Sequence, residues 1–157
     1  MSHGYLSNQI AAFSMHHDPS DESALQFKIL HNFYPTNILL NRMKVSDSEK
    51  CKECNVVDFI EHFFVHCSLV GPLWHHIAQL AFIETKCKIQ LNEITILFGI
   101  IKDDFPHLSQ NVINVYNWYI LLGKLCISKR KYGNQKNIVH IFEREIIVRT
   151  RSSLKPN

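Results

Sequence analysis

Apolar residues recur at helical spacing along most of the chain after residue 21. In the first such segment Leu25, Ile29 and Phe33 lie four residues apart, with Leu30 beside them on the same face. This spacing predicts a helix that begins at residue 22. The helix should end near Tyr34, because the residue before a proline is disfavoured in the α-helical region.

A second, short helix is expected directly after this break. Thr36 is suited to its N-cap, where a side-chain oxygen accepts a backbone N–H. Its apolar positions are Ile38, Leu39, Leu40 and Met43. A polar turn over residues 46–50 then leads into the first cysteine of the chain.

Three further helical patterns and one short apolar element follow. Gly71 and Pro72 open the first of these helices, since proline is tolerated in the first turn. Its expected inward residues are Leu73, Trp74, Ile77, Leu80 and Ala81. The element at residues 91–101 favours helix, although its sequence also suits a strand. A long helix over residues 109–131 should turn inward Val112, Val115, Tyr116, Tyr119, Leu122 and Cys126.

The last helix is expected at residues 138–149, after Gly133 and Asn134 end the long one. Ile138, Phe142 and Ile146 form its apolar stripe. The predicted fold class is therefore mostly α, a small helical domain built around the cysteine cluster considered below. Residues 1–21 are polar, His-rich and without period, so we expect a poorly ordered leader.

Composition supports a folded chain with a core, because 46% of its 157 residues are hydrophobic. Its net charge of +3 is unevenly distributed. Residues 1–123 carry 8 basic and 12 acidic residues, whereas residues 124–157 carry 9 basic and 2 acidic ones. A basic end on an acidic body fits a polyanionic partner, and it equally fits a solvated helix face.

The basic end supplies the candidate nucleic-acid contacts, which would act on phosphates by charge. They are Lys124, Lys129, Arg130, Lys131, Lys136, Arg144, Arg149 and Arg151. We expect single-stranded or structured RNA rather than sequence-specific duplex DNA, because no recognition-helix motif is visible.

The N-terminus lacks the basic and apolar regions of a secretory signal, and no apolar run is long enough to span a membrane. We therefore expect an intracellular protein, nuclear or cytoplasmic, that is not secreted. Its thiols should be reduced, and the odd count of 5 cysteines also argues against a disulfide framework. Metal ligation is the better use for a clustered subset of them.

Cys51, Cys54, His62 and Cys67 follow the spacing C-x2-C-x7-H-x4-C. A tight turn directs the first two sulfurs to one ion, and the set predicts a single tetrahedral, structural zinc ion. A fully ligated zinc has no open position for water and would not activate a nucleophile. On a continuing α-helix Cys67 would lie about 140° round from His62, so the helix should end near His66.

Three other histidines lie near the cysteines in the sequence and are alternative ligands. His66 is adjacent to Cys67, which makes joint ligation awkward, and His75 or His76 would have to donate from the next helix. A redox role for the CxxC pair normally needs a βαβ scaffold. In the helical turn at residues 58–64 that presents His62, Phe59 and Phe63 should face the core. Cys87 and Cys126 have no spaced partners and should be buried as small hydrophobic residues.

Four further motifs surround the ligands. They are ILHNFYPTN at residues 29–37, LNRM at 40–43, HFF at 62–64 and GPLW at 71–74. Together with the ligands they resemble the zinc-binding domain at the C-terminal end of LINE-type (non-LTR) retrotransposon reverse transcriptases. The motifs WYILLGK at 118–124 and FERE at 142–145 are similar to the segment downstream of that domain in vertebrate-type elements. The resemblance covers about residues 22–150.

The resemblance implies a module that helps a reverse transcriptase hold RNA or DNA, in contact with other protein parts of a retrotransposition complex. It assigns zinc to Cys51, Cys54, His62 and Cys67. No small-molecule substrate or membrane is implied. The polymerase and endonuclease parts of the family are missing, so we expect no enzyme activity. The acid pair Asp103 and Asp104 does not sit in a polymerase hairpin and is expected in a turn.

Four segments are expected: a leader at residues 1–21, a zinc-binding domain at 22–83, a helical extension with a basic end at 84–150, and a flexible tail at 151–157. Two alternatives to a nucleic-acid-binding module stay open. One is a zinc-stabilised module that docks on another protein, and the other is a retroelement fragment without function.

Overall fold

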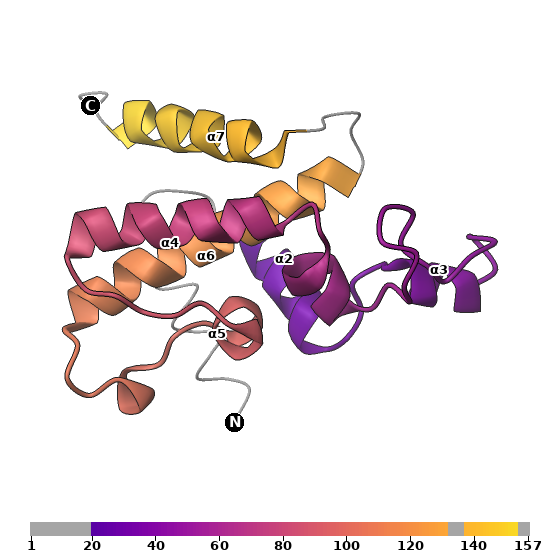
Figure 1. The fold of residues 1–157 in the computed structure, drawn as a ribbon, viewed down its shortest axis with the longest axis horizontal. Coiled ribbons are helices and arrows are strands. Elements are labelled where there is room, and N and C mark those ends of the chain that lie inside the picture. Colours follow the sequence, from indigo (N-terminus) through magenta and orange to yellow (C-terminus); the bar gives the residue numbers. More distant parts are fainter. Residues whose placement is uncertain (1–19, 132–136, 154–157) are drawn as a thin grey trace.

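The computed structural model of the chain describes residues 20–131 and 137–153, and this part is mostly helical (Figure 1). Six α-helices, one π-helical turn and one 3-10 turn follow each other in the order α2 Ser20–Leu30, α3 Asn37–Arg42, η1 His62–His66, α4 Gly71–Thr85, α5 Glu93–Phe98, η2 Lys102–Asp104, α6 Gln110–Lys131 and α7 Ile138–Ser153. The predicted helical class is confirmed for these residues. Gly133 and Asn134, residues 1–19 of the expected leader and residues 154–157 of the expected tail lie outside them. Residues 20–21 of the leader belong to α2 and residues 151–153 of the tail continue α7, so these two boundaries were wrong.

Helix α6 lies at the centre of the fold. It packs against α2, α4 and α7, and every residue from Tyr119 to Ile127 is buried. The expected inward stripe was therefore too narrow, because helices cover α6 on several sides. Val112 and Val115 of that stripe are only half-buried, since they lie near the start of the helix. One hydrophobic core runs from Leu25 to Phe142 and includes helices on both sides of the expected division at residue 83.

Helices α4 and α6 approach each other closely at Gly123. A Cβ atom at this position would lie 2.6 Å from Cδ1 of Ile77 and 3.0 Å from Cζ3 of Trp74. Both neighbours belong to the buried face of α4, as the sequence predicted. Glycine is thus required here because there is no space for a side chain between the two helices.

Helix α2 ends at Leu30, four residues before the predicted end, and the reason is a Schellman motif. Asn32 adopts a left-handed conformation with φ 56°, and the N–H of Phe33 donates to the carbonyl of Lys28. The turn directs Phe33 outward, and its side chain is 65% exposed. The expectation that Phe33 belongs to the buried stripe was wrong.

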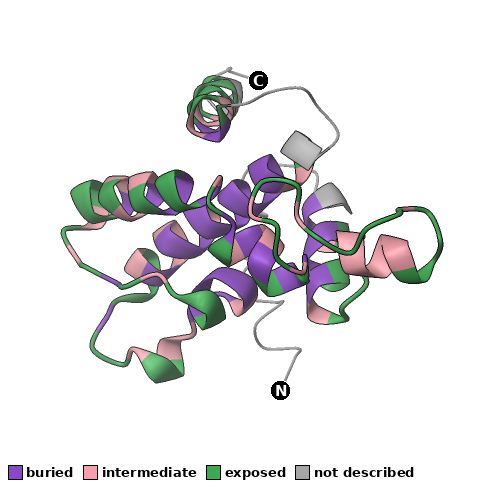
Figure 2. Ribbon diagram, turned by 45° about the vertical axis from the view of Figure 1, so that its right-hand side comes forward, coloured by how far each residue is buried: buried purple, intermediate pink, exposed green. Residues whose placement is uncertain are grey.

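Helix α3 forms where it was expected, but a different side chain caps it. Thr36 stands at the N-cap without a side-chain cap bond, whereas Oδ2 of the buried Asp58 accepts from the N–H of Asn37 at 3.1 Å. Residues 37–57, which we call the cysteine lobe, extend from the helical body, and none of them is buried (Figures 1 and 2).

Helices α5 and α7 agree with the sequence pattern. The apolar element at residues 91–101 forms α5, which begins with a capping box between Asn92 and Thr95. In α7, Ile138 and Phe142 are buried and Ile146 is half-buried. No helix in residues 20–131 or 137–153 is both long and apolar enough to cross a lipid bilayer.

Ion pairs fix the second half of α7 to the body. Arg149 has only 10% of its side chain exposed and lies 3.3 Å from Glu22 and 3.5 Å from Glu145. Lys129 of α6 lies 3.1 Å from the same Glu145. Burial acts to raise the pKa of Glu145, but its contacts with Lys129 and Arg149 outweigh this and hold the pKa below its ordinary value.

A substitution at Gly123 tests the packing of α4 on α6. Gly123→Val should lower the free energy of unfolding by about 1–3 kcal/mol, because the added carbons overlap Ile77 and Trp74. Gly71→Val is the matched control, since a Cβ at Gly71 meets no atom within 4 Å. Urea unfolding followed by circular dichroism measures both. Equal stability of the two variants would contradict the packing described.

The lowered pKa of Glu145 predicts an acid-sensitive contact. Its contribution to stability is present above the pKa of the unfolded chain and is lost as pH falls through the lower folded pKa. Glu145→Gln should therefore be less stable than the wild type at pH 7, with a difference that begins to shrink near the ordinary glutamate pKa of about 4.3 and disappears below the lower folded pKa. Asp104→Asn, in the exposed turn η2, is the control. A pH-independent difference for Glu145→Gln would refute the assignment.

Candidate metal centre

The first two cysteines lie on a tight turn at the end of the cysteine lobe. A single antiparallel bridge pairs Lys50 with Val57, and the N–H of Cys51 donates to the carbonyl of Val56 at 2.8 Å. The chain reverses through Asn55, whose φ of 57° is left-handed and whose N–H donates to the carbonyl of Cys51. Asparagine tolerates this conformation better than most residues. The turn therefore holds Cys51 and Cys54 together.

The histidine and the last cysteine are brought together by the π-helical turn η1. The N–H of Cys67 donates to the carbonyl of His62 at 2.8 Å, which is an i to i+5 hydrogen bond. This wider turn places residues five apart close together, whereas an α-helix would leave them on different sides. The predicted end of the helix at His66 is confirmed. The π-helical turn itself was missed, although the spacing of five residues between the ligands matches its period.

The four predicted ligands converge on one point. Their ligand atoms all lie within 4.8 Å of one another, and Cys51, Cys54, His62 and Cys67 are the one such group among the described residues. Sγ of Cys67 lies 3.9 Å from Sγ of Cys51 and 3.8 Å from Sγ of Cys54. Sulfurs at the corners of a tetrahedron around zinc, with Zn–S bonds of about 2.3 Å, would be about 3.8 Å apart. The arrangement therefore fits a tetrahedral metal ion.

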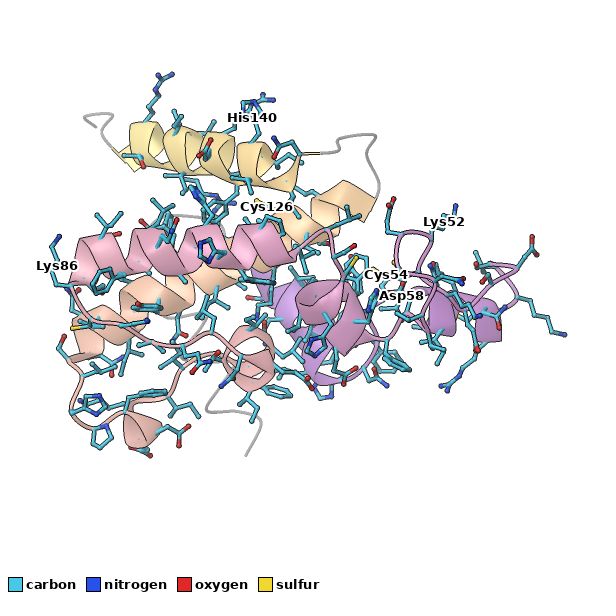
Figure 3. The ribbon with its side chains drawn as sticks, in the orientation of Figure 1. Lys52, Cys54, Asp58, Lys86, Cys126 and His140 are labelled. Atoms are coloured by element: carbon cyan, nitrogen blue, oxygen red, sulfur yellow. The ribbon has the colours of Figure 1, made fainter. Side chains whose placement is uncertain are left out.

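Two further features near the four residues fit a metal site. Nε2 of His62 is buried and has no hydrogen-bond partner in the described part of the chain. A buried nitrogen without a partner is costly, and a ligated cation would remove that cost. Ser68 supports Cys54 from outside the cluster, because its N–H lies 3.4 Å from Sγ of Cys54 and its hydroxyl 3.3 Å away. Figure 3 labels Cys54, which lies where the cysteine lobe meets the helical body. Such outer contacts orient metal ligands.

The electrostatics of the thiols differ within the cluster. Burial raises the pKa of Cys67 to about 12, and the neighbouring thiols add to the effect. The hydrogen bonds of Ser68 lower the pKa of the half-buried Cys54. Three thiolates this close together would repel each other strongly. A bound cation reverses that balance, because metal ligation stabilises the deprotonated form of each cysteine.

The alternative histidine ligands lie elsewhere. Nε2 of His66 lies 2.8 Å from a carboxylate oxygen of Glu93, and both side chains are about half exposed. His75 is exposed, and His76 lies 3.4 Å from Glu143 of α7. None of these three histidines is in the cluster.

Some of the other residues singled out in the sequence lie where they were predicted, and others do not. Cys126 is fully buried in the core, where burial raises the pKa of its thiol to about 12, but Cys87 is only half-buried. Phe63 packs on Tyr34 with ring centroids 5.1 Å apart, whereas Phe59 is 46% exposed and does not face the core. Asp103 and Asp104 are exposed in η2, as the predicted turn implied.

Two of the basic residues predicted to contact nucleic acid are buried or already paired in the fold. Lys124 is completely buried and donates to Oε1 of Gln26 at 2.5 Å, and burial pushes its pKa well below the ordinary value. It cannot reach a phosphate without disrupting the core. Arg149 is committed to Glu22 and Glu145. Both expectations were wrong because Gln26 and Glu22 lie far from these two residues in the sequence, so no local pattern indicates either contact.

The other six basic residues are placed differently. Arg144 and Arg151 are exposed on α7, and Lys129 is half exposed while pairing with Glu145. Arg130 and Lys131 lie in the last turn of α6, their side chains outside the described part, and Lys136 lies outside it entirely. Arg144 and Arg151 are therefore the cations of this set that are open to solvent and have no carboxylate partner among the described residues.

Comparisons with protein-family models, with curated proteins and with solved structures gave no match to this chain. The metal centre is therefore described by its own geometry, namely the spacing of the three sulfurs, the buried ring nitrogen and the support from Ser68.

Removal of one ligand tests the centre. Purified wild-type protein should contain one zinc ion per chain by native mass spectrometry, and Cys67→Ser should contain far less, because three ligands bind more weakly than four. Trypsin should then cut the cysteine lobe faster at its exposed basic residues Arg42, Lys44, Lys50 and Lys52. Cys87→Ser is the control and should keep its metal. One-to-one zinc in Cys67→Ser would contradict the assignment.

Proposed function

We propose that this chain is a non-catalytic, zinc-stabilised module that binds nucleic acid, related to the zinc-binding domain of non-LTR retrotransposon reverse transcriptases. The spacing of the sulfurs is the main support for zinc. The Sγ–Sγ distances of 3.8 and 3.9 Å match those expected between sulfur ligands of a tetrahedral zinc ion. Three thiolates and one imidazole are a donor set that suits zinc.

The zinc ion would act as a structural cross-link. Cys51 and Cys54 lie in the cysteine lobe, which buries no residue, whereas His62 and Cys67 are buried next to the core residue Phe64. Ligation would thus fasten a lobe without an apolar core to the helical body. With all four positions filled by side chains, the ion would have none left for a water molecule. This supports a structural rather than a catalytic role.

Charge supports the nucleic-acid partner. Residues 124–157 carry 9 basic and 2 acidic residues, and Arg144 and Arg151 expose their side chains on α7. The resemblance to reverse-transcriptase motifs points to RNA or DNA independently of this charge. Single-stranded or structured RNA is the preferred partner, because phosphate contacts from flexible cations do not require a recognition helix in a major groove.

The main alternative, docking on another protein, would need an exposed apolar stripe on α6 or α7. The expected stripe of α7 instead faces the body, with Ile138 and Phe142 buried, and that of α6 is mostly within the core. These placements argue against a protein that docks through those two stripes.

Salt dependence tests the proposal. Affinity for a labelled single-stranded RNA should fall steeply between low and physiological salt, because phosphate contacts release counterions. Arg144→Gln with Arg151→Gln should reduce the slope of log affinity against log salt by about 1.4, at roughly 0.7 per phosphate contact. Fluorescence anisotropy measures both.

The control replaces two exposed lysines that directly follow α4, Lys86→Gln with Lys88→Gln, and should leave the slope unchanged. If the wild-type protein binds no RNA or DNA oligonucleotide at low salt, the proposed function is wrong. An affinity that does not depend on salt would exclude the basic end as the binding surface.

A further inference from the structure

A pocket of about 350 Å³ lies where the cysteine lobe meets the helical body. Its lining comes from α2, α3, α5 and the segment that leads into η1. The buried apolar side chains of Ile29, Ile60 and Leu97 contribute to it. This volume is at the lower end of the range for small-molecule sites and suits a single flat group.

Unused polar and aromatic groups line the same pocket. Phe59 is 46% exposed, and Arg42 and Glu61 are both exposed. The arginine and the glutamate line one pocket without forming an ion pair, and in the described part of the chain neither pairs with another residue. An exposed aromatic ring and two free opposite charges around an apolar pocket are features of a binding site rather than of internal packing.

We propose that this pocket binds one unstacked base of a single-stranded nucleic acid, an inference that rests on the proposed function. The base would stack on Phe59, and Arg42 would bind the adjoining phosphate. The Glu61 carboxylate would accept a hydrogen bond from an exocyclic amino group, as acidic side chains do from N4 of cytosine. Bases with an amino group would therefore bind better than uracil or thymine.

The surroundings of the pocket favour a nucleic acid over a peptide. Helices α2 and α3 both contribute to the lining of the pocket, and each has a basic residue in its last turn. These residues are Lys28 in α2 and Arg42 in α3. The same end of α2 exposes Phe27, whose ring lies 4.2 Å from that of His31, and Phe33 follows in the turn. Aromatic rings interspersed with cations are the usual surface for single strands.

Phe59→Ala tests the proposal in the full, zinc-loaded chain. Its affinity for an eight-nucleotide oligocytidine should fall roughly tenfold, because one base loses its stacking partner. Its affinity for an abasic strand of equal length should not change, since that strand offers only phosphates. Phe82→Ala is the matched control, because Phe82 of α4 is also 46% exposed, and it should bind both strands as the wild type does.

Glu61→Gln tests which base is preferred. The wild type should bind oligocytidine more tightly than oligouridine, and the variant should lose most of that preference because an amide both donates and accepts. Zinc content and circular dichroism confirm that each variant is folded. Should Phe59→Ala not fold, Arg42→Gln replaces it and should weaken binding to both strands.

The possible failures are distinguishable. If the wild type binds RNA and Phe59→Ala binds it equally well, the pocket proposal is wrong while the proposed function stands. If the wild type binds neither strand, both proposals fall. Binding of a leucine-rich amphipathic peptide through Phe59, with no change in oligocytidine affinity on Phe59→Ala, would show that the pocket serves a protein partner and would overturn the inference.

Discussion

The cysteine lobe depends on the convergence of three sulfurs and one imidazole, because it has no apolar core of its own. None of residues 37–57 is buried, and α3 is a helix of 6 residues, too short to be stable alone. Ordering this segment costs conformational entropy that its sparse packing does not offset. A metal ion shared with the buried His62 and Cys67 would supply the missing free energy. The helical body is different, since α6 is buried among its neighbours and contributes to an apolar core.

The sequence predicted the helices well wherever local chemistry determines them. Apolar periodicity and the Gly71–Pro72 start predicted α4, and the ligand spacing predicted which four residues come together. Features that depend on distant partners were missed. Lys124 is buried because Gln26 accepts its hydrogen bond from α2, and no local pattern indicates that pairing. The left-handed Asn32 ended α2 before the proline could.

Several basic residues near the C-terminal end of the chain stabilise the fold and are not available to a partner. Arg149 of α7 pairs with a glutamate of α2, and Lys129 of α6 pairs with a glutamate of α7. Lys124 lies inside the core. The net charge of this segment therefore overestimates the number of basic residues that can contact a polyanion. The pocket beside Phe59 offers a second region for that partner, and its lining comes from both the lobe and the body. An ion that fastens the lobe would thus also shape the pocket, which links the metal to the proposed function through structure alone.

X-ray absorption at the zinc edge of the purified, metal-loaded protein is the most direct measurement of the central claim. It reports the atoms bound to zinc and their distances without altering any ligand. The account predicts three sulfur neighbours at about 2.3 Å and one nitrogen at about 2.0–2.1 Å. A shell made only of nitrogen and oxygen neighbours, or one with an ordered water in place of a sulfur, would contradict it.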